Sequence, residues 1–193
     1  MDEYLKDEDV QLMLRFKDGD NSSFEVLLEK YQSRIINFLY KITGDKAESE
    51  DLAQEVFIRV YHSGEKYTPQ SKFSTWIYVI AKNLALNEIR RRKGVFFNFL
   101  KDSSEEEVIK EIPDNKSSSA LNELEKKDLG KIVKKAIDSL PANQKIAVIL
   151  NRYENLSYEE IAEITGCSTP AVKSLLNRAK TALKLKLGKY VSD

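Results

Sequence analysis

The chain has 193 residues with 31 basic and 31 acidic side chains; 41% of residues are hydrophobic and 32% charged. This composition is typical of a globular protein with one large or two small domains and excludes a disordered chain. One cysteine and one histidine exclude an internal disulfide and disfavour a metal site or a Ser-His-Asp triad, so we expect no metal and no cofactor. No apolar stretch approaches the ~20 residues of a membrane span, and the acidic N-terminus is no signal peptide, so we expect a cytoplasmic protein without membrane insertion.

Four helices are predicted in residues 1–94, which we interpret as a first domain. The first ends at a turn that contains Gly19, and the second carries an apolar stripe at helical spacing and ends at Gly44. A loop over residues 63–71 precedes the last of the four. The expected bounds are about residues 7–17, 24–43, 45–61 and 75–93.

Two of these helices carry polar sides that need an explanation. The third has apolar residues one turn apart and an acidic, amide-bearing side opposite them. The fourth has a polar stripe formed by Asn83, Asn87 and Arg90, with Trp76 on the same side and Arg91 in the basic run that follows. Such a stripe suits contacts to phosphates and unstacked bases, although a buried tryptophan beside a solvated basic helix end would look similar.

The middle and the end of the chain differ in charge. Residues 95–120 form an acidic, serine-rich stretch that we expect to be a partly disordered linker, with one apolar cluster over residues 95–100 that packs on a neighbour. A second domain covers residues 121–193 and is basic overall. Because no strand pattern competes anywhere, the predicted fold class is all-α, with two helical domains.

The second domain contains a helix-turn-helix pattern. Ser157 and Glu160 have the spacing of a capping box, Gly166 suits the left-handed turn between two helices, and Thr169 is the expected N-cap of a second helix with Pro170 at its first position. The side chains expected on the outside of that helix are Ala171, Lys173, Ser174, Asn177 and Arg178. An exposed polar N-terminal half suits entry into the DNA major groove, and an ordinary helical hairpin is the alternative.

Three motifs precede that pattern in a fixed order: DLAQEVF at residues 51–57, FSTWIYVIAKN at 73–83 and DSLPANQ at 138–144. With the helix-turn-helix, this order resembles the extracytoplasmic-function (ECF) type of bacterial RNA polymerase sigma factor, from about residue 18 to the end. The resemblance implies a sigma factor that binds the core polymerase and reads the −35 and −10 promoter elements, trapping melted non-template bases at the latter. It implies as partners the clamp helices and flap of the core polymerase, promoter DNA and an anti-sigma factor.

The resemblance also implies roles for individual residues. Recognition helices of many relatives have threonine where Ala171 stands and arginine where Leu175 stands, so the −35 sequence does not carry over. The residues that match the clamp-docking segment are Asp51, Gln54, Glu55 and Phe57. Those assigned to the −10 element are Phe73, Trp76 and Asn83, with Asn87, Arg90 and Arg91 from the polar stripe. Those assigned to the −35 element are Lys173, Ser174 and Arg178, with Ala171 and Asn177 beside them.

Two other functions remain as alternatives. A stand-alone helix-turn-helix regulator would use the same second domain, normally as a symmetric dimer, but no dimerisation heptad is visible. An enzyme would need a nucleophile–base pair, a phosphate loop or a metal cluster, and the sequence offers none, so we assign no catalytic residue.

Overall fold

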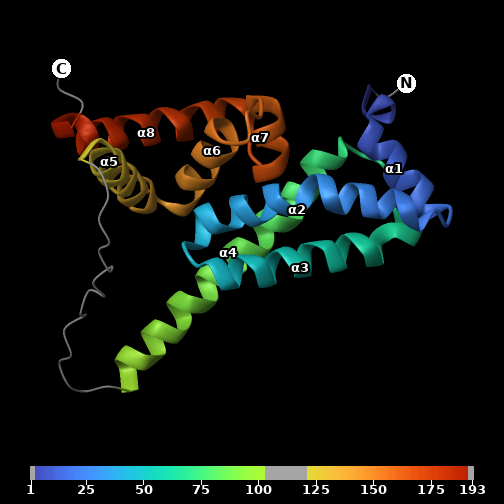
Figure 1. Ribbon diagram of the computed structural model, residues 1–193, viewed down its shortest axis with the longest axis horizontal. Coiled ribbons are helices and arrows are strands. Elements are labelled where there is room, and N and C mark those ends of the chain that lie inside the picture. Colours follow the sequence, from blue (N-terminus) through green and yellow to red (C-terminus); the bar gives the residue numbers. More distant parts are fainter. Residues whose placement is uncertain (1–2, 103–120, 191–193) are drawn as a thin grey trace.

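The computed structural model describes residues 3–102 and 121–190, and within these ranges the chain is all-α, without a strand (Figure 1). The expected disorder of the linker concerns residues that are largely outside the described ranges. Short 3-10 turns flank the helices at Glu3–Lys6, Gly64–Lys66 and Gly188–Tyr190. The α-helices are α1 (Glu8–Lys17), α2 (Asn21–Thr43), α3 (Lys46–Ser63), α4 (Phe73–Asp102), α5 (Leu121–Asp138), α6 (Ala142–Arg152), α7 (Tyr158–Thr165) and α8 (Thr169–Leu187).

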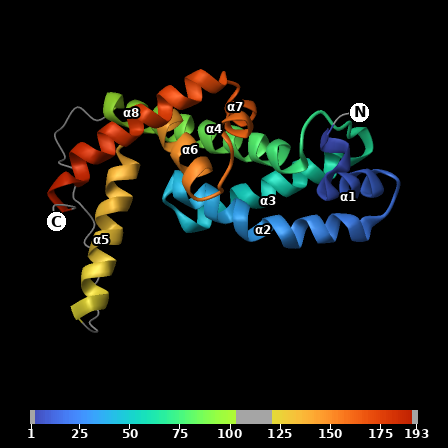
Figure 2. The same ribbon diagram turned by 90° about the horizontal axis from the view of Figure 1, so that it is seen from above.

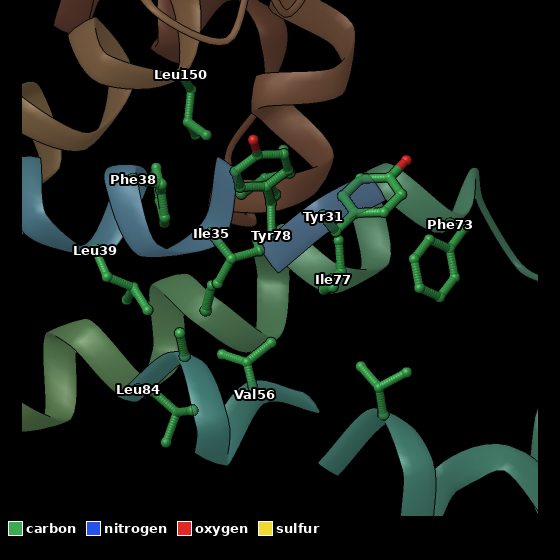
Figure 3. Packing of buried hydrophobic residues seen from close by; sticks show 14 of the residues in the cluster. Tyr31, Ile35, Phe38, Leu39, Val56, Phe73, Ile77, Tyr78, Leu84 and Leu150 are labelled. Carbon is green, nitrogen blue, oxygen red and sulfur yellow. The ribbon is translucent and has the colours of Figure 1, made fainter. Parts of the chain in front are cut away.

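Helices α1 to α4 pack around an aromatic core. Tyr31 on α2 meets Phe73 with ring centroids 5.2 Å apart, and Phe38 meets Tyr78 edge-on at 5.0 Å. All four side chains are essentially inaccessible to solvent, and Figure 3 shows Tyr31 and Phe38 extending from α2, and Phe73 and Tyr78 from α4. Edge-to-face aromatic pairs add to the stabilisation that burial of their large apolar area already supplies.

The second domain places α7 and α8 as the expected helix-turn-helix. Ser157 and Glu160 form both hydrogen bonds of a capping box, and Gly166 ends α7 in the left-handed conformation at φ 69°. Ile161 and Ile164 are completely buried, as their spacing predicted. The tight turn is therefore confirmed, because a side chain at position 166 would be strained at that φ.

Two expected helix ends were wrong. Helix α4 ends at Asp102 and not near Lys93, so residues 95–102 are helical. A single Gly94 costs a helix about 1 kcal/mol and does not end it without a left-handed turn or a proline. At α8 the N-cap is Ser168 and not Thr169, since the Ser168 side chain accepts a hydrogen bond from the Ala171 backbone N–H and leaves Thr169 inside the helix.

The second domain lies directly on the first. Figures 1 and 2 show α6 and α7 over α2 and α4, whereas the C-terminal part of α4 projects away from the body. Buried side chains of both domains form one continuous apolar cluster. Figure 3 shows Leu150 of α6 directed toward Phe38 of α2. None of the described helices has a long enough apolar stretch to cross a lipid bilayer.

Candidate nucleic-acid and polymerase interfaces

An apolar groove of about 660 Å³ runs between α2 and α3. We call it the α2–α3 groove. Ile58 and Tyr61 are about half exposed in it, at 50% and 49%, which is unusual for such large apolar side chains. Its lining consists of Phe24, Leu28, Gln32, Ile36, Glu50, Ala53, Gln54, Phe57, Ile58, Tyr61 and His62.

The four residues expected to dock on a polymerase are not all in this groove. Gln54 and Phe57 line it, with Gln54 exposed and Phe57 only 8% exposed. Asp51 is exposed on α3 but is not part of the lining. Glu55 accepts a hydrogen bond from Arg59 one turn later at 2.7 Å and lines a different groove. The structure therefore places two of the expected docking residues in the α2–α3 groove, one in a different groove and Asp51 in neither lining.

A second groove of about 480 Å³ lies between α3 and α4, and we call it the α3–α4 groove. It brings together Trp76 and Asn83, which the sequence assigned to one side of a helix, and its walls carry both charges and apolar surface. Trp76 is half-buried and packs on the rings of Tyr67 at 5.1 Å and Phe73 at 5.8 Å. The remaining lining residues are Glu55, Ile58, Arg59, His62, Ser63 and Ile80.

Two aromatic residues behind Trp76 determine its position. Phe73 is completely buried, so its side chain supports Trp76 from within the core and has no surface to offer DNA in this arrangement. Tyr67 is 5% exposed, and its hydroxyl has no hydrogen-bond partner among the described residues. Burial, with a smaller contribution from the negative charge of Asp7, raises the pKa of Tyr67 to about 12.

The basic end of α4 is partly neutralised. Asn87 and Arg90 are exposed, and Arg90 makes no ion pair within the described part of the chain. Arg91 forms a bidentate pair with Glu88 at 2.7 Å for both bonds. Arg92 pairs with Glu48 of α3 and with Glu88. The polar stripe predicted on α4 thus exists as one exposed surface, although its arginines differ in how freely they meet a phosphate.

The N-terminal half of α8 is open to solvent. Lys173, Ser174, Asn177 and Arg178 are exposed, and Ala171 is half-buried. On the opposite side Val172 and Ala179 are completely buried against the domain core. Leu175 is half-buried and packs against that core, so it presents little to a ligand of this face. The helix is therefore held on one side, with a polar and basic side free for contact.

Polar contacts join the two domains where α6 and α7 meet α2 and α4. The carboxylate of Glu154 accepts a hydrogen bond from the Tyr78 hydroxyl and lies 3.5 Å from the Arg34 guanidinium. Burial and the bond to Glu154 both raise the pKa of Tyr78, so the phenol stays protonated. Two lysines donate across the junction to backbone carbonyl oxygens, Lys82 to Ile164 at 2.8 Å and Lys145 to Ile42 at 2.9 Å.

A further ion pair joins Lys72 to Glu160 at 2.9 Å, so Glu160 serves both the α7 cap and the junction. Burial alone would raise the pKa of Glu160, but the Ser157 backbone N–H and Lys72 together lower it. Sequence reasoning found the cap and missed the junction. The sequence signal for the junction was weak, because nothing in the sequence indicates that Glu154, in the loop after α6, meets Tyr78 on α4.

The α2–α3 groove was also missed. Its signal was present in the third helix, where Ile58 and Tyr61 lie off the stripe that contains Val56 and Val60. Apolar residues off the buried stripe indicate a second apolar surface. Within residues 3–102 and 121–190, no group of His, Cys, Asp and Glu side chains is arranged to hold a metal ion.

Comparisons with known proteins show the family of the chain. The family model for sigma-70 region 2 matches residues 27–95, and the model for sigma-70 region 4 matches residues 131–183. The chain is 31% identical to the RNA polymerase sigma-H factor of Pseudomonas aeruginosa over 184 residues, covering 92% of this chain and 93% of that protein. It is 33% identical to the ECF sigma-E factor of Escherichia coli K12 over 196 residues, covering 97% of each. The sigma factor RpoE of Bartonella quintana, crystallised with the anti-sigma factor NepR, shares the fold with a TM-score of 0.65 at 24% identity, over 86% of this chain and 96% of that one.

Proposed function

We infer the function from the premise that this chain belongs to the sigma-70 family, in its extracytoplasmic-function branch. It is an alternative sigma factor, which binds core RNA polymerase and directs it to promoters. The observation that carries the mechanism is that each domain has its own exposed polar surface, the α3–α4 groove in one and the outer side of α8 in the other. We propose that the chain itself catalyses no reaction, that the polymerase performs the chemistry, and that it works with the polymerase in the cytoplasm.

The α2–α3 groove is the surface we assign to the polymerase. A helix that covers its exposed apolar side chains lowers the free energy by about 25 cal/mol per Å² of apolar surface removed from water. Gln54 and Glu50 line the same groove and supply polar partners for a basic ligand. The proposed ligand is the clamp helices of the largest polymerase subunit, with Phe57 forming part of the apolar floor. Asp51, exposed on the same helix, contributes charge.

We assign the −10 element to the α3–α4 groove and the adjoining surface of α4. Trp76 offers an aromatic surface for an unstacked base, and Asn83 supplies both a donor and an acceptor for a base edge. Asn87 and Arg90 continue the surface toward the phosphates. Unstacking costs a few kcal/mol per base, and stacking on protein aromatics returns about 1–3 kcal/mol, so melting proceeds without ATP.

The −35 element is assigned to α8. Lys173 and Arg178 are exposed cations suited to phosphates or guanine edges, and Ser174 and Asn177 reach base edges when α8 lies in the major groove. Leu175 packs on the core, so one position on this helix contributes support and not readout. Two weak readers on one chain act as one specific reader, because tethering raises the effective concentration of the second contact.

An anti-sigma factor is a further proposed partner. The fold neighbour RpoE was crystallised with the anti-sigma factor NepR. This chain exposes the apolar α2–α3 groove, which is suited to a helical ligand. The flap of the polymerase is the partner we propose for the second domain. There a groove of about 970 Å³ between α5, α6 and α8 is lined mainly by apolar atoms.

We keep the functional division into residues 1–94, 95–120 and 121–193, although α4 itself runs to Asp102.

The test is reconstitution with sigma-free core RNA polymerase of Escherichia coli and a pool of genomic fragments from the source organism. We expect co-elution with the core and transcripts that start at defined promoters. The variant Ile58→Asp should abolish co-elution, whereas Val26→Asp should not, since Val26 is 48% exposed on α2 and Ile58 is 50% exposed in the groove. Binding to duplex DNA without any binding to the core would favour a stand-alone regulator.

A further inference from the structure

The basic run of α4 contains consecutive arginines with unequal partners. Arg90 is exposed and has no ion pair within the described part of the chain. Arg91 donates two hydrogen bonds of 2.7 Å to Glu88, one turn earlier on the same helix. Arg92 pairs with both Glu48 and Glu88. Since an arginine in a protein always carries its charge, these residues differ only in their neighbours.

The carboxylates of this cluster are less accessible than the arginines. The side chains of Glu88 and Glu48 are only 11% and 18% exposed. Those of Arg91 and Arg92 are 67% and 42% exposed. Glu48 lies in the first turn of α3, which runs beside α4 at the point where α4 leaves the body (Figure 1). A largely buried carboxylate that loses its cation is costly. A phosphate that draws either arginine away must therefore overcome that cost.

The guanidinium of Arg92 has a third partner. It donates a hydrogen bond of 3.4 Å to the backbone carbonyl oxygen of Thr43, the last residue of α2. The last carbonyl groups of a helix carry partial negative charge and favour a cation beside them. An external phosphate would have to replace two carboxylates and this helix end, whereas Arg90 offers its whole charge to a ligand.

We propose that two carboxylates, Glu48 and Glu88, determine how many DNA phosphates α4 binds. They hold Arg91 and Arg92, so that Arg90 is the arginine of this run that contacts the DNA backbone. This inference rests on the proposed function, because it concerns how α4 meets promoter DNA. Phosphate contacts supply affinity for any sequence, and a chromosome offers a great excess of sites without a promoter. The paired arginines therefore limit how much of the free chain such sites retain.

The first test compares the arginines in the reconstituted holoenzyme. Binding to a promoter fragment recovered in the transcription assay is measured over a range of salt concentrations for Arg90→Ala, Arg91→Ala and Arg92→Ala. The slope of log affinity against log salt concentration falls by about 0.7–0.9 for each phosphate contact that is lost. We expect this decrease for Arg90→Ala and an unchanged slope for the other two variants. An equal decrease for Arg91→Ala or Arg92→Ala would overturn the proposal.

The second test releases the paired arginines. The double variant Glu48→Gln, Glu88→Gln keeps the size of both side chains and removes their charge. The probe is a random-sequence DNA duplex, and the protein is the free full-length chain. We expect the variant to bind more tightly than wild type, by up to about fivefold at about 0.15 M salt for each phosphate gained, with a steeper dependence on salt.

The matched control is the double variant Glu25→Gln, Glu29→Gln. Both side chains are exposed on α2, and neither makes a hydrogen bond or ion pair within the described residues. The control changes the net charge of the chain by the same amount, and we expect an unchanged salt slope. Where the double variant at the cluster does not fold, as judged by circular dichroism, Glu88→Gln alone is used, since it leaves Glu48 as a partner for Arg92.

Equal slopes for wild type and the variant at the cluster would overturn the proposal, because the ion pairs would then only join α4 to α3. An increase of the same size in the control would overturn it as well, since net charge alone would explain the result. Failure of the proposed function looks different. A wild-type chain that never binds the core yields no promoter complex, while the random duplex still reports on the carboxylates.

Discussion

The two sides of α4 differ in how far they are buried. On the side that faces α7, Tyr78 and Ala81 are completely buried and Lys82 donates to a backbone carbonyl of the other domain. On the side that faces α3, Trp76 is half-buried and Asn83 is exposed in an open groove. One helix therefore has a buried contact with the second domain on one side and, a few residues away, an open surface suited to a nucleic acid. Rigidity on the first side positions the second.

The largest expected effect comes from the closed side. Leu150→Ala removes a completely buried side chain at the domain junction and should lower the free energy of unfolding by about 2–5 kcal/mol. Urea denaturation followed by circular dichroism measures the loss. The matched control is Leu185→Ala, where 78% exposure limits the change to about 0.5 kcal/mol. Similar losses in the two variants would show that α6 does not depend on this junction.

The open side is tested by Asn83→Ala. We expect promoter complexes to weaken by about 1–3 kcal/mol, roughly 5- to 150-fold, because an amide contact to a base edge is lost. The free energy of unfolding should hardly change, since Asn83 is exposed. Electrophoretic mobility shift with the core polymerase and a recovered promoter measures the first quantity. Equal binding by Asn83→Ala and wild type would remove this residue from the reading surface.

A smaller effect, an increase in the free energy of unfolding, is expected at Tyr67, which packs behind Trp76. Tyr67→Phe removes a buried hydroxyl that has no partner among the described residues and should stabilise the chain by about 1 kcal/mol. On the closed side, Tyr78→Phe should destabilise it, because its hydroxyl serves Glu154. Thermal unfolding of both variants at neutral pH gives the comparison. Destabilisation by Tyr67→Phe would mean that the hydroxyl is satisfied in solution.

A further difference at Tyr67 appears only in alkaline solution. The pKa of Tyr67 is raised from 10.0 to about 12 in the folded chain. The free energy of unfolding therefore falls as the pH rises from 10 to 12, where the unfolded chain releases a proton that the folded chain keeps. In Tyr67→Phe, stability should fall less steeply with pH across this window. Chemical denaturation at several pH values measures the slope, and identical slopes would contradict the shift.

Local patterns in the sequence predicted most helices and the helix-turn-helix, and failed where the outcome depended on distant partners. The capping box at Ser157 and the turn at Gly166 are determined by neighbours within one turn, so they were visible. The end of α4 was not, because a glycine without a left-handed turn does not stop a helix. Phe73 matched a DNA-reading motif, yet the side chain is in the core, where it supports Trp76.

The site was predicted in the same uneven way. Trp76 and Asn83 share a groove as their spacing indicated, and the exposed side of α8 carries the expected residues. The domain junction was invisible, since Arg34, Tyr78 and Glu154 come from three separate segments and no periodicity links them. The roles of these residues toward DNA and polymerase remain predictions for the measurements above.

Two of the lysines that cross the junction, Lys82 and Lys145, differ from Glu154 in how substitutions of their partners affect them. Lys82 and Lys145 donate to the main-chain oxygens of Ile164 and Ile42, and every amino acid carries such an oxygen. Substitutions at positions 42 and 164 therefore leave the acceptor carbonyl oxygen in place, provided that the helices keep their positions. Glu154 needs particular side chains on the opposite domain. Substitution of Glu154 or of its two partners therefore changes the side-chain contacts of the junction, while the backbone-directed contacts preserve the way the domains fit together.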